Sequence, residues 1–304
     1  MNSGGHAVRQ DSISAITFML LAIFLLATMD VSIKRLVESY PSIQVVFLRC
    51  LFSAPWFAAW ILLRNRKLFR PARLRHHLLR ALIGIVMLYA VAECFRELPL
   101  ADAYAIFFAA PLLITVLSGV IMKEPAGTVR LVAAMIGFGG VLVVLKPGAS
   151  SLLSYGSVMA LVAVVSYTFV VLLLRSLGRN EHSMTIAFWY TGLIGLGTAF
   201  FAWQAWVDLR WEHWPWFVVL AVSGTLGQLV LTAAFRRASA AVIAPFEYLH
   251  MFWAVLYGWW FWGELPTLRT WLGSAVIIAC GLYILFRERK LAIGDPAAAP
   301  VAPD

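Results

Sequence analysis

The feature that constrains this chain most is a series of long apolar runs separated by short polar segments. Each run is about 20 residues long, enough for a helix to cross a hydrocarbon layer of roughly 30 Å, whereas barrel strands would alternate over ~10 residues. With 62% hydrophobic and 13% charged residues, the chain is too apolar for a soluble domain. It is therefore predicted to be an all-α integral membrane protein. The ten predicted transmembrane helices cover residues 13–37, 42–63, 78–97, 101–122, 128–146, 155–175, 184–206, 215–235, 240–262 and 268–286.

A second feature is an internal repeat at a constant offset of 140 residues, at which Glu124 takes the position of Glu264. It predicts two duplicated units, residues 13–148 and 149–288. Because each unit would hold five spans, an odd number, the second would enter the membrane in the opposite orientation, as in many secondary transporters. The matching segments are Ala101–Pro125 with Ala240–Pro266, Phe95 and Arg96 with Phe235 and Arg236, and Arg35 with Arg175.

The basic residues predict how the chain lies in the membrane. The net charge is +9, and with both termini inside, the inner segments hold 17 Lys and Arg residues against six in the outer segments. This bias predicts a multi-pass protein of the plasma (inner) membrane with both termini in the cytoplasm. The densest basic run, from Arg64 to Arg80, is predicted to be a cytoplasmic loop facing anionic lipid. Membrane lipid, and not nucleic acid, is therefore the expected partner.

The two ends of the chain are expected to carry no chemistry. Residues 1–12 are polar and residues 289–304 are rich in Ala and Pro, so both are predicted to be disordered. The run Ile13–Ala27 is longer than the core of a signal peptide and lacks a small-residue cleavage pattern after it. The first helix is therefore expected to be retained.

No cofactor or metal site is expected. The cysteines Cys50, Cys94 and Cys280 lie in apolar runs without metal-type spacing. The sequence has no phosphate-binding loop, zinc-protease motif or nucleophile elbow. We therefore expect no catalytic residues, and the chain is not expected to be an enzyme.

The ten spans, the segment APFEY at Ala244–Tyr248, and the Gly263-Glu264 and Lys123-Glu124 ends of the repeated helices resemble the EamA branch of the drug/metabolite transporter superfamily. The resemblance covers residues 13–286. It implies a central cavity lined by the first four and the sixth to ninth spans. It also implies a small-molecule substrate, since members of this branch move amino acids, nucleotide derivatives, vitamins such as riboflavin, S-adenosylmethionine or drugs. A monomer or a homodimer is expected.

Five charged residues within the spans lack a counterpart at the repeat offset, which makes them candidates for substrate or ion contact. A charge at the centre of a membrane helix costs about 2.5–3.5 kcal/mol on insertion scales, and usually marks a cavity, an ion pair or an ion path. These residues are Asp30, Lys34, Arg49, Glu93 and Glu247.

Asp30, Lys34 and Arg49 each have a structural alternative. Asp30, Lys34 and Glu38 share one helix face, so they could pair along the first helix. Arg49 could hold a substrate carboxylate or phosphate, or could neutralise Asp30 or Glu93.

Glu93 belongs to a polar stripe with Tyr89 and Glu97 on the third span. It could bind a cation or carry a coupling proton. The alternative is a salt bridge to Arg96 or Arg49.

Glu247 is the leading site candidate. If the ninth span enters the membrane at Ala240, Glu247 and His250 would lie roughly 10–15 Å deep, and Pro245 can open the helix beside them. His250 could titrate or stack on a substrate, or be hydrogen-bonded between helices. Pro111 offers a similar break in the fourth span, displaced by six positions in the repeat.

The weaker substrate-binding candidates are Gln228 in the eighth span and several aromatic residues suited to wall a cavity for a planar substrate. Most aromatic residues of so apolar a chain must face lipid or the membrane interface. Each aromatic candidate could therefore either line the cavity or lie at the lipid-facing surface. The aromatic candidates are Tyr248, Trp189, Tyr190, Tyr167 and Phe107.

Together these features predict a secondary active transporter or exchanger that moves a small amphipathic or aromatic metabolite by alternating access. The alternatives are a membrane-embedded enzyme acting on a lipid or isoprenoid, and a channel. An enzyme of that kind would gather Asp-rich or His/Asp motifs at one membrane face, whereas the charges here are spread over four spans.

Overall fold

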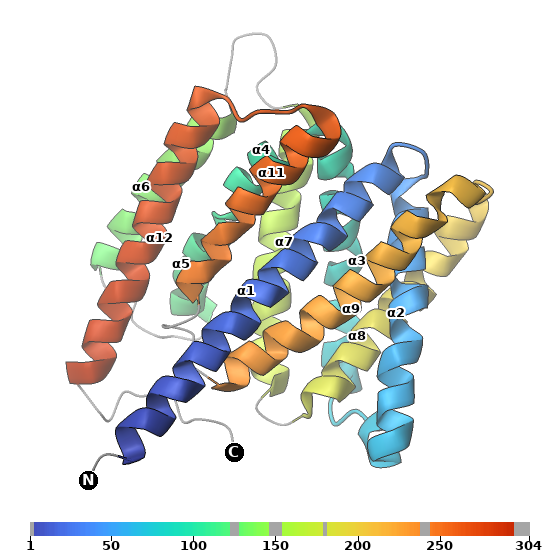
Figure 1. Ribbon diagram of the computed structural model, residues 1–304, viewed down its shortest axis with the longest axis horizontal. Coiled ribbons are helices and arrows are strands. Elements are labelled where there is room, and N and C mark those ends of the chain that lie inside the picture. The colour runs from blue at the N-terminus through green and yellow to red at the C-terminus, as the bar shows by residue number, and fades with distance from the viewer. Residues whose placement is uncertain (1–2, 122–127, 146–153, 179–180, 238–243, 295–304) are drawn as a thin grey trace.

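The protein is described by a computed structural model over residues 3–121, 128–145, 154–178, 181–237 and 244–294, and within these ranges it contains helices and no strand. The predicted all-α class is therefore confirmed. In Figure 1, α1 begins and α12 ends at the same end of the bundle. The elements are α1 (Ser3–Val37), α2 (Ser42–Arg64), η1 (Arg66–Phe69), α3 (Leu74–Glu97), α4 (Leu100–Phe107), α5 (Ala110–Ile121), α6 (Thr128–Leu145), α7 (Tyr155–Gly178), α8 (Ser183–Gln204), η2 (Trp211–His213), α9 (Trp214–Arg237), η3 (Ala244–Leu249), α11 (His250–Trp262) and α12 (Leu268–Gly294).

Eight segments of the described chain are long and apolar enough to cross a membrane, which makes the protein multi-pass. The apolar part of α6, Leu131–Leu145, is shorter than these eight. The predicted ninth span is divided between η3 and α11. The number of ten spans therefore stays a prediction.

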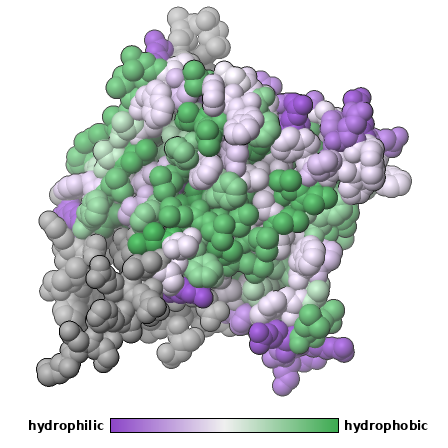
Figure 2. All heavy atoms as spheres, in the orientation of Figure 1, coloured by the Kyte–Doolittle hydropathy of each residue, from purple (hydrophilic) through white to green (hydrophobic). Residues whose placement is uncertain are grey.

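The surface suits a membrane environment. On the face shown in Figure 2, hydrophobic residues cover the middle of the helices and strongly hydrophilic residues gather toward their ends. Large apolar side chains such as Leu63, Leu196 and Trp260 are exposed on helices α2, α8 and α11. An apolar surface of this extent is unfavourable in water and favourable in lipid.

The fourth and ninth predicted spans are not continuous helices. The fourth divides into α4 and α5 at Phe108 and Ala109, and the ninth is the 3-10 helix η3 followed by α11. Pro111 and Pro245 lie beside the two interruptions, where the missing amide proton of proline weakens an α-helix. Although the prolines are displaced from each other in the repeat, the interruptions are not, because Phe108 lies 140 residues before Tyr248 at the end of η3.

The most extensive helix packing joins the first unit of the repeat to the second. α1 packs along α9 and α3 packs along α7, and the repeat equates α1 with α7 and α3 with α9. Two further pairs, α2 with α8 and α6 with α12, each join helices that are equivalent in the repeat, and α4 packs on α11, the counterpart of α5. This is the set of contacts that a two-fold relation between the units would produce.

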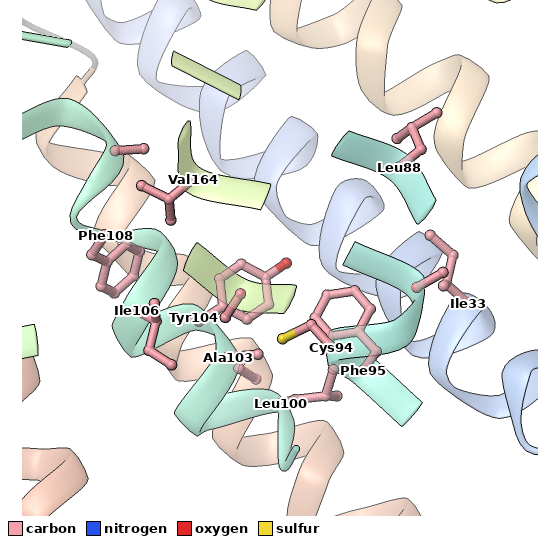
Figure 3. Packing of buried hydrophobic residues seen from close by; sticks show 14 of the residues in the cluster. Ile33, Leu88, Cys94, Phe95, Leu100, Ala103, Tyr104, Ile106, Phe108 and Val164 are labelled. Carbon is pink, nitrogen blue, oxygen red and sulfur yellow. The ribbon is translucent and has the colours of Figure 1, made fainter. Parts of the chain in front are cut away.

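The largest buried cluster surrounds α4 (Figure 3). Leu100, Ala103, Tyr104 and Ile106 of α4 are buried, and Phe95 at the end of α3 packs beside them with 1% of its surface exposed. The rings of Phe95 and Tyr104 lie 6.3 Å apart. The position of Tyr104 is therefore set by dense packing on both sides of its helix.

The first and last helices extend beyond their predicted bounds. α1 begins at Ser3, so residues 3–12, expected to be disordered, continue the first helix. α12 continues to Gly294, beyond residue 289, where the disordered tail was expected to begin. Neither extension contains a proline, and an existing helix grows by one hydrogen bond per residue. Lys123, Glu124 and residues 295–304 lie outside the described residues.

Two glycines bring α6 and α12 into close contact. A methyl group on Gly140 would lie 2.9 Å from the carbonyl oxygen of Gly273, and one on Gly273 would lie 2.7 Å from the carbonyl oxygen of Gly140. Backbone atoms cannot rotate away as a side chain can. Gly139, on the same helix, has no atom within 4 Å of the corresponding position.

We predict that Gly140→Ala lowers the free energy of unfolding by about 1–3 kcal/mol, because the two helices must separate to admit the methyl group. Its matched control, Gly139→Ala, should leave stability unchanged or raise it by up to ~1 kcal/mol. Thermal unfolding of the purified protein in detergent measures both changes. Equal effects of the two substitutions would contradict the close approach.

Candidate functional site

The two helix interruptions meet in the interior. The ring of Phe108, where α4 ends, lies edge-on to the ring of Tyr248 in η3, with centroids 5.1 Å apart. One turn earlier, Tyr104 stacks on His250, the first residue of α11, at 5.3 Å and an angle of 20°. Since Phe108 and Tyr248 are equivalent in the repeat, this contact lies where the two units face each other.

Asp30 of α1 joins this contact. The hydroxyl of Tyr104 donates a hydrogen bond to the carboxylate of Asp30. We call Asp30, Tyr104, Phe108, Tyr248 and His250 the central cluster. It combines one carboxylate, one imidazole and three aromatic rings from helices of both units.

Local structure explains how Tyr248 and His250 reach the cluster. The Nδ1 atom of His250 lies 3.0 Å from the carbonyl oxygen of Glu247, which fixes the ring against its own backbone. On the other side, Gly281 of α12 leaves room for the hydroxyl of Tyr248, which a methyl group at that glycine would overlap. The 3-10 turn and one glycine therefore position both side chains.

Glu247 and Arg49 lie near the cluster with unused hydrogen-bonding capacity. Neither side chain forms a hydrogen bond or an ion pair with another residue of the described ranges, and both are partly buried. Arg49 lies within electrostatic range of Asp30, and Glu247 within electrostatic range of Tyr167 on α7. Both signs of charge are thus available beside a set of aromatic rings.

Lys34 forms an ion pair with Glu264 outside the central cluster. Its ammonium group lies 3.0 Å from both carboxylate oxygens of Glu264 and donates to the carbonyl oxygen of Leu98 at 2.9 Å. The side chain of Lys34 is 6% exposed. Glu38 accepts a hydrogen bond from the indole of Trp262. The alternative in which Asp30, Lys34 and Glu38 pair along α1 is therefore not what the structure contains.

The Gly-Glu end of α11 has a physical explanation. Gly263 adopts φ 66°, a left-handed conformation that favours glycine and ends the helix. The turn directs Glu264 back toward α1, where it meets Lys34.

At the opposite end of the bundle, Glu181 joins the two units. Its carboxylate accepts hydrogen bonds from the backbone amides of Ala72 and Arg73, each at 3.0 Å, and lies 2.7 Å from Nε2 of His77. The His77 and Glu181 side chains are 0% and 3% exposed. The start of α3 is thus fixed to the segment that leads into α8.

Trp189 helps to hold the basic loop. Its indole donates to the carbonyl oxygen of Phe69 at 3.0 Å, and Thr185 donates to the carbonyl oxygen of Leu68 at 2.8 Å. These contacts give Trp189 a structural role in addition to its predicted one.

Among the remaining candidates, Phe107 lies edge-on to Tyr104 of the central cluster, with ring centroids 5.9 Å apart. Glu93, Tyr89 and Gln228 form no hydrogen bond, ion pair or ring contact with the cluster among the described residues. Glu93 is buried and lies 3.8 Å from Arg96, as in its structural alternative. Tyr89 lines a surface pocket together with Phe201, and Gln228 is exposed on α9.

Tyr104 and Phe108 belong to the central cluster but are not among the residues predicted from the sequence. At the repeat offset, Tyr104 corresponds to Ala244. Like the charged candidates, it is a polar residue without a counterpart in the other unit. Tyr104 carries no charge, so the criterion of an unmatched charge does not select it. Phe108 corresponds to Tyr248 in the repeat. Because both positions are aromatic, Phe108 is not unmatched and does not stand out in the sequence.

Two duplicated helical units whose interrupted helices face each other across polar side chains define a membrane transporter. The chain belongs to the EamA-like transporter family, which matches residues 13–146 and 154–287. The predicted family is therefore confirmed.

The chain is similar to several named transporters. It is 25% identical to the pseudopaline exporter CntI of Pseudomonas aeruginosa, over 91% of this chain and 97% of that protein. It is 23% identical to the S-adenosylmethionine uptake transporter of Rickettsia prowazekii, over 91% and 94%. It is 28% identical to the riboflavin transporter of Vibrio cholerae, over 74% and 76%. These relatives confirm the predicted class, a transporter of small metabolites and not an enzyme.

A solved crystal structure with 16% sequence identity has the same fold, with a TM-score of 0.62 over 91% of this chain and 98% of that one.

The contact between Lys34 and Glu264 leads to a prediction about stability. Lys34→Met leaves Glu264 without its partner and should lower the free energy of unfolding by about 2–4 kcal/mol, while the double change with Glu264→Gln should recover part of the loss. Arg35→Gln breaks the exposed pair with Glu38 and should cost less than about 0.5 kcal/mol. Thermal unfolding in detergent tests all three. Additive losses in the double variant would show that the contact contributes no coupling.

Proposed function

We propose that this protein is a secondary active transporter or exchanger that carries a small amphipathic or aromatic metabolite across the inner membrane by alternating access. The observation that supports the proposal best is the central cluster, in which two interrupted helices from different units meet around Asp30, Tyr104 and His250. Sites at the junction of two repeats, built on discontinuous helices, are typical of carriers.

We further propose that ten spans form two inverted five-helix repeats. α6 and the η3–α11 segment would complete the eight longer spans. In Figure 1, α1 and α7, which the repeat equates, run in opposite directions along the bundle. The paired packing of equivalent helices supports the same arrangement.

The chemistry of the site favours a zwitterionic substrate with a planar part. Asp30 and Glu247 can each accept hydrogen bonds from an ammonium group, and Arg49 can donate to a carboxylate. The rings of Tyr104 and His250 can stack on an aromatic group or a cation. Relatives named for pseudopaline, S-adenosylmethionine and riboflavin agree with a polar metabolite of this size class.

Alternating access requires that contacts between the units break at one end at a time. The pair of Lys34 and Glu264 closes one end, and the hydrogen bonds of Glu181 to Ala72 and Arg73 close the other. Each contact joins the first unit to the second. Rocking of the units would break one contact while the other holds.

A thermal-shift screen of the purified protein against amino acids, riboflavin, S-adenosylmethionine and purines would identify a substrate. Counterflow of that compound in proteoliposomes, saturating with its concentration, is the expected result. Non-saturating conductance without counterflow would identify a channel instead.

For the site itself, Glu247→Gln and Asp30→Asn should each lower the rate of transport at least ~10-fold, since each removes a charge-assisted contact to the substrate. Glu212→Gln, on the exposed segment η2, is the control and should transport normally. The rates are measured as counterflow at equal amounts of reconstituted protein. A Glu247→Gln protein with the normal rate and unchanged pH dependence would exclude Glu247 from the site.

The proposed orientation makes a separate prediction. In a variant without native cysteines, Glu212→Cys should react with a membrane-impermeant maleimide in intact spheroplasts, because the segment between α8 and α9 would face outward. Lys67→Cys, exposed on η1, should react only after the membrane is permeabilised. The reverse pattern of labelling would place both termini outside.

A further inference from the structure

Arg80 is buried although it ends the basic run that was predicted to face lipid headgroups. It lies in the second turn of α3 and is 7% exposed. Its Nε and Nη1 atoms are enclosed and have no hydrogen-bond partner among the described residues. The guanidinium lies over the ring of Tyr190 on α8, 4.0 Å from the ring centroid. The hydroxyl of Tyr190 is also buried and has no partner within the described ranges.

The position of Tyr190 is tightly set. A methyl group on Gly84, one turn beyond Arg80, would lie 2.6 Å from Cε2 and 2.7 Å from the hydroxyl of Tyr190. The tyrosine is therefore held against α3 between Arg80 and Gly84. The unpartnered tyrosine hydroxyl therefore lies against Gly84, one turn along α3 from the free donors of Arg80.

A second cation faces the same tyrosine. Arg49 of α2 lies within electrostatic range of Tyr190, and α2 packs along α8. Neither Arg49 nor Arg80 forms an ion pair with any carboxylate of the described chain. Two arginines and a hydroxyl thus share one region, in which the Asp30 carboxylate lies within electrostatic range of Arg49 but forms no ion pair with it.

A buried arginine in a membrane helix normally has a paired anion, because an isolated charge is poorly solvated there. The planar guanidinium is suited to carboxylate and phosphate, which accept several hydrogen bonds from it. We propose that Arg80, Tyr190 and Arg49 form a binding subsite for a carboxylate or phosphate group of the transported molecule. This inference rests on the proposed transport function and adds Arg80 and Tyr190 as the groups that would bind the anionic part of the substrate together with Arg49.

The phosphate of a lipid headgroup shares this chemistry, so the test must separate the two sources. The unfolding temperature of the purified full-length protein is measured in phosphatidylcholine nanodiscs against sodium phosphate and sodium acetate, with sodium chloride at equal ionic strength as the reference. A second set of nanodiscs contains phosphatidylglycerol. Phosphate or acetate should raise the unfolding temperature of the unaltered protein in a saturable manner.

The variants test which residues bind the anion. Arg80→Gln and Arg80→Lys should each weaken the apparent affinity at least ~10-fold, since lysine lacks the planar fork. Tyr190→Phe, which keeps the ring and removes the hydroxyl, should weaken it several-fold, about the value of one hydrogen bond. Arg237→Gln is the matched control, because Arg237 also lies over an aromatic ring, 4.3 Å from that of Phe18, but is exposed. It should bind as the unaltered protein does.

Three outcomes would overturn the inference: no response to phosphate or acetate beyond that to chloride, an equal response in the Arg80 variants, or an Arg80-dependent response to phosphatidylglycerol alone. If Arg80→Gln does not fold, Arg80→Lys and Tyr190→Phe still decide the matter. Binding is measured here independently of transport. Counterflow without anion binding would therefore contradict the subsite but not the proposed transport function. Anion binding without counterflow would support the subsite and contradict the proposed transport function.

Discussion

Hydrocarbon offers no hydrogen bonds to a peptide group, so a membrane helix can be interrupted only where protein surrounds it. In this protein the interruptions of α4–α5 and η3–α11 lie against each other in the interior. The backbone stays bonded through the first of them, where the amide of Phe108 donates to Tyr104 and that of Ala109 to Ile106, each at 3.0 Å. The interruption therefore costs little, and it brings side chains of both units to one place.

Charged side chains follow the same constraint. Lys34 with Glu264, and His77 with Glu181, are closed pairs that join the units near their ends. By contrast, Arg49, Arg80 and Glu247 lack such a partner among the described residues, and each is buried or partly buried. The paired charges thus join the two units, whereas these three groups have hydrogen-bonding capacity that no described residue uses.

The fold followed from the sequence because a helix of about 20 apolar residues is almost the only way for such a chain to meet lipid. Comparison of the two repeats also identified Asp30, Arg49 and Glu247 as candidates, because a charge without a counterpart can be recognised from the sequence alone. The partners were not visible: Lys34 meets Glu264, 230 residues away, through the packing of α1 on α11. Arg80 was assigned to a loop because basic residues near a helix end usually reach the interface, and its burial depends on Gly84 and Tyr190.

Because the central cluster draws on both units, substrate binding at the proposed site would be linked to motion of the units. A substrate held by Asp30 of α1 and by η3 or α11 would contact the first unit and the second at once. If its contacts are strongest when both ends are closed, its binding stabilises that state relative to the open ones, and by no more than the difference in affinity. A molecule that reaches only one unit gains nothing from closure. Selectivity would then arise from the length of the substrate and the spacing of its charges as much as from any single contact.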